Sequence, residues 1–275
     1  MAIMAAFNLE ARQYDIVNAF TNSELDETVH CACPEGYTKE GSCLLLLRAL
    51  YGLRRSLILW LKEFSKTLRE LGLEEVSGEP CLFTNDWLII FFYVDDIVAL
   101  CRTEHLPHLI EFEKRLEARY EIRSLGELNW FLGVRIVWDQ QAKKVWLCQD
   151  SYIDKIATKF HLEHHRLAHT PLPPSDLFPY EATATPQQIY AYQQCVGSIN
   201  FAAVITRPDV AFAVSRLATF LCNPSPAYLA ATDQTITYLY RTRTFAIQYS
   251  TPVESNQHQI FLCVSDTAFA DDHQT

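Results

Sequence analysis

The stretch Leu-Ile-Ile-Phe-Phe-Tyr-Val-Asp-Asp-Ile-Val-Ala-Leu, residues 88–100, places two adjacent carboxylates between two apolar segments rich in β-branched and aromatic residues. This pattern predicts a tight hairpin with Asp95 and Asp96 at its tip. Two like charges at one turn raise each other's pKa, so the pair is costly unless a divalent cation or another partner cancels the charge. An oxygen-liganded Mg²⁺ fits such a pair, and a solvated turn is the plainer alternative. The apolar flanks favour a buried sheet that holds the pair in one place.

The composition is that of a globular chain. Its 275 residues are 49% hydrophobic and 12% aromatic, enough for one large domain or two modest ones with a substantial core. The longest apolar runs, residues 44–47 and 88–94, are far shorter than the roughly 20 residues that cross a bilayer. Residues 1–7 carry no basic segment of a secretory signal, and nine scattered cysteines favour a reducing compartment. We therefore expect an intracellular protein with no membrane partner.

The charge balance argues in two directions about nucleic acid. A net charge of −10 is unfavourable for non-specific binding of nucleic acid by the chain as a whole. Local basic clusters oppose this average, and the richest of them comprises Arg54, Arg55, Lys62, Lys66 and Arg69. Net charge alone therefore does not exclude a nucleic-acid partner.

The first half of the chain predicts helices and strands that carry acidic groups. Residues 2–12 have helical composition, and residues 13–20 suggest a strand that ends near Ala19, which places Asp15 on a strand. Ser56 can cap a helix that runs to residue 71 with an aromatic core face. Residues 103–120 predict an amphipathic helix packed against the sheet.

The second half changes from strands to helices. A second hairpin is predicted from residues 129–138 and 145–148, with Gly133 inside its first strand, where the missing side chain suggests close backbone approach. The proline-rich residues 170–186 predict a linker at a subdomain boundary. Three helices are predicted at residues 187–205, 208–221 and 226–240, and two terminal strands at residues 245–249 and 259–264.

Five blocks of this sequence, taken in order, resemble the reverse transcriptases of copia-type retrotransposons. Each block alone is weak evidence, but five in series over nearly the whole chain form a specific pattern. The blocks are Gln-Tyr-Asp-Ile-Val-Asn-Ala-Phe (13–20), Ala-Leu-Tyr-Gly-Leu-Arg-Arg-Ser (49–56), Tyr-Val-Asp-Asp (93–96), Trp-Phe-Leu-Gly-Val (130–134) and Thr-Arg-Pro-Asp-Val-Ala-Phe-Ala-Val-Ser-Arg (206–216).

The resemblance implies an α+β fold and an RNA-directed DNA polymerase. Residues 1–140 would form the polymerase palm, an antiparallel sheet with helices on one face, together with part of the fingers. Residues 141–245 would form a mainly helical thumb or connection, and residues 246–275 the truncated start of a ribonuclease H domain. The implied partners are a primed RNA or DNA template, deoxynucleoside triphosphates and the other Pol domains, integrase and ribonuclease H. The implied location is a cytoplasmic virus-like particle or the nucleus.

The implied catalytic centre is a two-metal site. Asp15, Asp95 and Asp96 match the family's catalytic carboxylates, with Asp15 and Asp95 the closer metal ligands and the carbonyl of Ile16 a further oxygen. Two Mg²⁺ or Mn²⁺ ions held there would activate the primer 3′-oxygen and stabilise the triphosphate leaving group.

The resemblance also implies a nucleotide site. Phe20 matches the aromatic residue beneath the incoming sugar. The amides of Asn18 and Ala19 match those that contact the triphosphate, and Tyr51 and Gly52 match the block that packs against the nascent base pair.

Two further sites follow from the same resemblance. Phe131, Leu132 and Gly133 match the primer grip, which fixes the primer 3′-end for in-line attack. Asp266 matches the first metal-binding carboxylate of the ribonuclease H domain.

Departures from the family pattern leave an alternative function open. Leu57 stands where the family has Pro, and Arg55 where Gln is common, so the template-facing turn can differ. The chain begins just before the first catalytic strand, so we expect the basic fingers segment to be missing. The alternative is thus a catalytically inactive, truncated remnant with the same fold.

Rival chemistries have weaker support. A palm-type nucleotide cyclase also uses paired acidic residues on a hairpin, but the primer-grip and ribonuclease H matches argue against it. His30, Cys31 and Cys33 suggest zinc, yet no second ligand pair follows at finger-like spacing.

Overall fold

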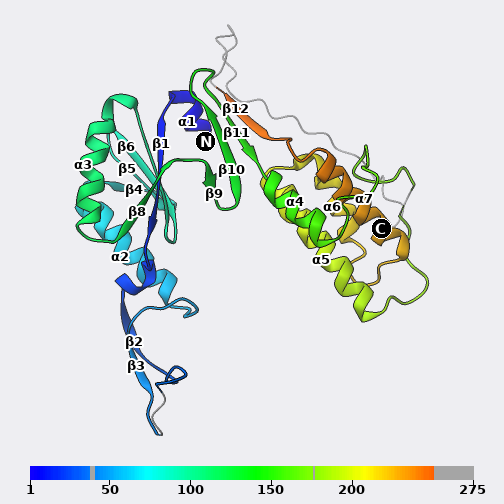
Figure 1. The fold of residues 1–275 in the computed structure, drawn as a ribbon, viewed down its shortest axis with the longest axis horizontal. Coiled ribbons are helices and arrows are strands. Elements are labelled where there is room, and N and C mark those ends of the chain that lie inside the picture. The colour runs from blue at the N-terminus through cyan, green and yellow to red at the C-terminus, as the bar shows by residue number, and fades with distance from the viewer. Residues whose placement is uncertain (38–40, 176, 251–275) are drawn as a thin grey trace.

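The computed structural model describes residues 1–37, 41–175 and 177–250. Figure 1 shows a sheet flanked by helices, a two-stranded ribbon that projects from it, and a bundle of helices beyond a second sheet. The central sheet is antiparallel, with strand order β4-β5-β6-β7-β1-β8. Its strands are β1 (Glu10–Ile16), β4 (Glu74–Val76), β5 (Glu79–Thr84), β6 (Leu88–Tyr93), β7 (Asp96–Cys101) and β8 (Ile122–Glu127).

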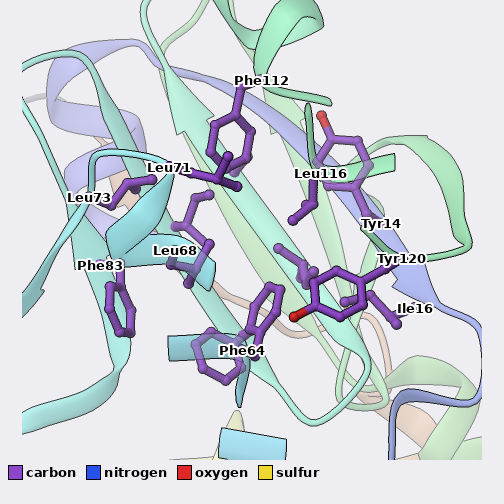
Figure 2. Packing of buried hydrophobic residues seen from close by; sticks show 14 of the residues in the cluster. Tyr14, Ile16, Phe64, Leu68, Leu71, Leu73, Phe83, Phe112, Leu116 and Tyr120 are labelled. Atoms are coloured by element: carbon purple, nitrogen blue, oxygen red, sulfur yellow. The ribbon is translucent and has the colours of Figure 1, made fainter. Parts of the chain in front are cut away.

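Both faces of the central sheet are buried, because successive side chains of a strand point to opposite faces. On β7, Ile97 and Ala99 pack into the core beneath α2 (Ser56–Glu70) and α3 (Leu106–Glu117), whereas Val98 and Leu100 pack into a core on the opposite face. Figure 2 shows the first of these cores, with side chains from both helices meeting the sheet.

A second sheet and a short helix cover that opposite face. The sheet has strand order β12-β11-β10-β9. Together with α1 (Ala2–Phe7), its strands β10 and β11 close the core on that face. Its strands are β9 (Trp130–Phe131), β10 (Val134–Asp139), β11 (Lys144–Cys148) and β12 (Ile247–Ser250). Helices α2 and α3 cover one face as expected, but the helices are not confined to it, because α1 and the second sheet cover the other face.

A two-stranded ribbon leaves the central sheet just after β1. The 3₁₀ helix η1 (Ala19–Asn22) leads into β2 (Glu24–Cys31), which pairs antiparallel with β3 (Leu44–Arg48). In Figure 1 the ribbon extends away from the other regions, and most of its side chains are exposed.

The helical region has its own core. It comprises α4 (Asp150–Lys159), α5 (Pro186–Ile205), the 3₁₀ helix η3 (Pro208–Val210), α6 (Ala211–Ala218) and α7 (Pro226–Arg241). Within residues 170–175 and 177–185 there is no helix or strand, as the proline-rich pattern predicts. No helix in the described ranges is both long and apolar enough to cross a bilayer.

The structure corrects the predicted boundaries of the helix and strand around Asp15. The predicted helix over residues 2–12 ends at Phe7 and the strand runs from Glu10 to Ile16, so the strand predicted over residues 13–20 is wrong at both ends. Asn8 and Asn18 have left-handed φ values of 51° and 52°, a conformation that asparagine tolerates well. Asn8 ends the helix, and Asn18 redirects the chain just after the strand.

The hairpin at residues 129–148 also differs in one detail. Gly133 was predicted inside a strand, but it lies with Leu132 in the two-residue turn between β9 and β10. Both residues have positive φ, 50° for Leu132 and 78° for Gly133, so the glycine serves the turn. The sequence did not predict β4, β5, β8 or α4.

The predicted domain boundaries can be located relative to the observed strands. The boundary at residue 140 lies in the turn that joins β10 to β11, and β12, just beyond residue 246, pairs with β11. Residues 251–275, which include Asp266 and the second predicted terminal strand, lie outside the described residues.

Candidate active site

Pairing of β1, β6 and β7 brings the three predicted catalytic carboxylates to one end of the sheet. Tyr93 of β6 pairs with Asp96 of β7, so Val94 and Asp95 form a two-residue turn. The sequence predicts both Asp95 and Asp96 at the tip of the hairpin, but Asp96 is the first residue of β7. Asp15 of β1 pairs directly with Asp96. Directly opposed residues of an antiparallel pair share a face of the sheet, with Cβ atoms about 5 Å apart. Asp15 and Asp96 thus lie side by side beside the turn that carries Asp95.

The turn that carries Asp95 has an unusual backbone. Val94 has a φ of 58°, a left-handed conformation that is rare for a β-branched residue. The carbonyl oxygen of Val94 accepts a hydrogen bond from the indole Nε1 of Trp60 at 2.6 Å. The carbonyl oxygen of Asp95 accepts one from the backbone N of Ile16 at 3.0 Å. Both carbonyls of the turn are therefore held from outside it.

The negative charges of Asp15 and Asp95 act on the Asp96 carboxyl. Burial raises the pKa of the Asp96 carboxyl above its ordinary value, and the negative charges of Asp95 and Asp15 raise it further. A hydrogen bond with the Gln13 side chain lowers it in part. Such mutual repulsion is what a bound cation relieves.

Tyr51, in the segment that precedes α2, contacts the carboxylate site. Its hydroxyl donates a hydrogen bond to Oδ2 of Asp95 at 3.1 Å, and its ring centroid lies 4.5 Å from that of Phe20. Burial, followed by the charge of Asp95, raises the pKa of Tyr51. Phe20 itself is only 8% exposed and belongs to the core beneath α2 and α3. The two aromatic residues of the predicted nucleotide site therefore contact each other, and Tyr51 also contacts Asp95.

Gly52 follows Tyr51 for a conformational reason. Its φ is 94°, and a Cβ at this position would meet no atom within 4 Å. The turn therefore requires glycine for its left-handed backbone.

The end of β1 places the remaining predicted nucleotide contacts. Ile16 is the last residue of β1 and pairs with Ile122 of β8. Asn18 precedes η1, and Ala19 is its first residue. The backbone thus turns one residue past the strand that carries Asp15, and the amides of this turn lie three and four residues after that aspartate.

The donor set suits a hard divalent cation in kind, since all its members are carboxylates. In the described residues, however, no three His, Cys, Asp or Glu side chains gather closely enough to hold an ion. The Tyr51 hydroxyl engages Oδ2 of Asp95, but a carboxylate that accepts one hydrogen bond still has lone pairs for an ion. Cation binding would instead require the carboxylates to move closer together.

The predicted primer grip lies on the turn between β9 and β10. Leu132 is 46% exposed at the tip of this turn. Phe131 contacts Phe91 of β6 edge to face, with ring centroids 5.2 Å apart. The turn is thereby packed against the same strand that leads into Val94 and Asp95.

Sequence reasoning missed two polar roles of buried side chains. Trp60 was expected only as part of a helical core face, yet its indole N–H holds the carboxylate turn. Arg207 lay in a family-like block without a predicted role, and it is 1% exposed and forms an ion pair with Asp209. The hydrogen bond of Trp60 has no sequence signal, because it joins segments that only the fold brings together. The pair of Arg207 and Asp209, two residues apart in one block, could have been recognised from the sequence.

Comparison with known proteins agrees with this geometry. Residues 1–174 match the family model described as reverse transcriptase (RNA-dependent DNA polymerase). The chain is 27% identical over 256 residues to the retrovirus-related Pol polyprotein from transposon TNT 1-94 of Nicotiana tabacum, which covers 88% of this chain and 19% of that protein. It is 31% identical over 244 residues to the putative transposon Ty5-1 protein YCL074W of Saccharomyces cerevisiae, covering 86% of this chain and 78% of that protein.

A third relative extends the pattern to another plant. The retrovirus-related Pol polyprotein from transposon RE1 of Arabidopsis thaliana is 28% identical over 247 residues, covering 86% of this chain and 16% of that polyprotein. The chain thus spans less than a fifth of the two plant Pol polyproteins and most of the yeast protein.

Proposed function

The chain belongs to the reverse transcriptase family of copia-type retrotransposon Pol polyproteins, and on this premise we propose that it forms an RNA-directed DNA polymerase core. Asp15, Asp95 and Asp96 would be its metal-binding carboxylates. The observation that carries the proposal is the pairing of Asp15 with Asp96 next to the turn that carries Asp95. The proposed substrates are a primed template and deoxynucleoside triphosphates, and the proposed partners are the other Pol domains.

The chain's own groups would divide the work of nucleotidyl transfer. Bound Mg²⁺ or Mn²⁺ would supply activation of the primer 3′-oxygen and stabilisation of the leaving group. The carboxylates would hold these ions. The backbone N–H groups of Asn18 and Ala19 would face the triphosphate, since oriented amides bind anions. The turn at Leu132 would hold the primer end.

The proposal is tested by template-directed primer extension. Purified chain is incubated with poly(rA)/oligo(dT), dTTP and Mg²⁺ or Mn²⁺, both by itself and within a chimeric tobacco Pol polyprotein that carries residues 1–250 in place of the homologous stretch. We expect cation-dependent extension in at least the chimera. Absence of extension in both forms, with each shown to be folded by circular dichroism, would support the inactive remnant instead.

One observation favours the remnant as a second candidate. Across the part of the chain that the structure describes, no three His, Cys, Asp or Glu side chains gather closely enough to hold an ion. A functional polymerase must therefore draw its carboxylates together when the cation binds, whereas a remnant need not. Because the Tyr51 hydroxyl is hydrogen-bonded to Asp95, the chemical shift of the Tyr51 ring during Mg²⁺ titration separates the two, since only the polymerase predicts a saturable change.

Phe20→Val is expected to weaken discrimination against ribonucleotides. If the Phe20 ring forms a wall under C2′ of the incoming sugar, its loss removes steric exclusion of a 2′-hydroxyl, and the ribo/deoxy incorporation ratio should rise about tenfold. Because Phe20 is also buried, we expect the free energy of unfolding to fall by about 2 kcal/mol. Incorporation is measured with the form of the enzyme that extends primers.

The matched control is Phe83→Val. Phe83 lies on β5, is fully buried and belongs to the same core. This control should destabilise the fold and leave the incorporation ratio unchanged. An unchanged ratio in Phe20→Val as well would mean that Phe20 serves packing alone.

A further inference from the structure

Helix α2 reaches the carboxylate turn through one buried side chain. Trp60 is 1% exposed, and its indole N–H donates to the carbonyl oxygen of Val94 at 2.6 Å. Val94 immediately precedes Asp95 in the turn. The hydrogen bond therefore links the core helix to the backbone that sets the position of the Asp95 carboxylate.

The turn needs such a link because its backbone is unfavourable by itself. A valine at a φ of 58° is strained, and a strained conformation persists only where the surrounding structure fixes it. The turn contains no glycine or asparagine that would adopt this conformation easily. Its two carbonyls are held by Trp60 on one side and by the backbone N of Ile16 on the other.

The indole is itself held in one orientation. Its ring stacks on Phe64 with centroids 5.1 Å apart and meets Tyr120 edge to face at 5.4 Å. Figure 2 shows Phe64 and Tyr120 within this core. One turn earlier on the same helix, the Ser56 hydroxyl donates to the carbonyl oxygen of Leu50 at 2.5 Å. Helix α2 therefore anchors both the carboxylate turn and the segment that carries Tyr51.

We propose that Trp60 is a positioning residue for the active site, which holds Asp95 in place through the carbonyl of Val94. A phenylalanine or leucine could fill much of the same space, but neither has a donor that could reach this carbonyl. The consequence for cation binding rests on the proposed polymerase function, whereas the effect on the turn does not.

The test replaces the donor and keeps the shape. Benzothienylalanine, in which sulfur takes the place of the indole N–H, is incorporated at position 60, and Trp60→Phe serves as the genetically simple variant. Hydrogen exchange is followed at the amide of Ile16, which donates to the carbonyl of Asp95. It is compared with the amide of Leu73, which donates to the carbonyl of Leu68 at the end of α2. Mn²⁺ affinity is measured by electron paramagnetic resonance.

We expect exchange at Ile16 to accelerate about fivefold, the effect of losing one hydrogen bond, while exchange at Leu73 is unchanged. Mn²⁺ affinity should fall by a similar factor. Unchanged exchange at Ile16, equal acceleration at both amides, or unchanged Mn²⁺ affinity despite an opened turn would each overturn the proposal. If the parent chain binds no Mn²⁺, the polymerase function fails, and the exchange data still decide whether Trp60 holds the turn.

Discussion

Asp95→Asn should abolish most template-directed primer extension, with a loss of about 10²–10³ in rate. Asparagine has the same shape but lacks the charge that would hold a cation beside the reacting phosphate. Mn²⁺ affinity should fall at least about tenfold, since even indirect partners of metal ligands cost that much. Extension rates and calorimetric Mn²⁺ titrations measure the two effects on the same preparation.

The fold should survive this substitution, because Asp95 is one of the groups that raise the pKa of Asp96. Removing its charge relieves repulsion, so the melting temperature should not fall. The matched control is Asp86→Asn, since Asp86 is exposed in the turn at the other end of β6. Metal binding and activity should be normal in the control. Equal Mn²⁺ affinity in the parent chain and Asp95→Asn would place the cation elsewhere.

The carboxylate hairpin was the part of the fold most readable from sequence. Residues 88–100 place a polar pair between two apolar segments, which predicts a tight hairpin. The turn lies at Val94 and Asp95, one residue before the predicted tip at Asp95 and Asp96. The pairing of Asp15 with Asp96 did not follow from such a pattern, because it joins strands far apart in the chain. It was anticipated only through the family resemblance, which supplied a known topology.

The sequence did not predict individual hydrogen bonds or backbone angles. The pattern placed Trp60 on the core face of α2, but nothing in it indicated that the indole N–H would meet the carbonyl of Val94. Likewise the family resemblance placed Gly52 in the nucleotide site but did not indicate that the turn needs a left-handed φ of 94° there. Short strands such as β4 were missed because their three residues include two glutamates and lack an apolar period.

The helical region depends on the buried charged side chain of Arg207. Arg207, just before η3, is 1% exposed and forms two hydrogen bonds to Asp209, of 2.9 and 2.7 Å. It also donates to the carbonyl and hydroxyl oxygens of Thr242, which follows α7. Its guanidinium lies over the rings of Tyr238 and Phe245. One side chain thus connects η3, the end of α7 and the segment that leads to β12.

The side chain of Arg207 is 1% exposed and that of Asp209 is 32% exposed, so only the arginine end of the pair is buried. Arg207→Met should therefore lower the free energy of unfolding by about 1.5–3 kcal/mol, the contribution of a hydrogen bond to a charged group. Denaturant unfolding followed by circular dichroism measures the loss, and Arg166→Met, at an exposed position after α4, should change it by less than about 0.5 kcal/mol. The double variant Arg207→Met, Asp209→Leu should recover part of the loss, because the carboxylate that has lost its cationic partner is then removed as well.

A pH series adds an independent check. Burial alone would raise the pKa of Asp209, but the hydrogen bonds and charge of Arg207, together with a hydrogen bond from Tyr238, outweigh it and hold the pKa below its ordinary value. The ion pair therefore contributes its full stability above the unfolded pKa of about 4 and loses it as pH falls through the lower folded value. This acid-dependent loss should become much smaller in Arg207→Met, where only the Tyr238 hydroxyl still donates to Asp209 from these two side chains. An undiminished loss would show that the stabilising contact of Asp209 is not with Arg207.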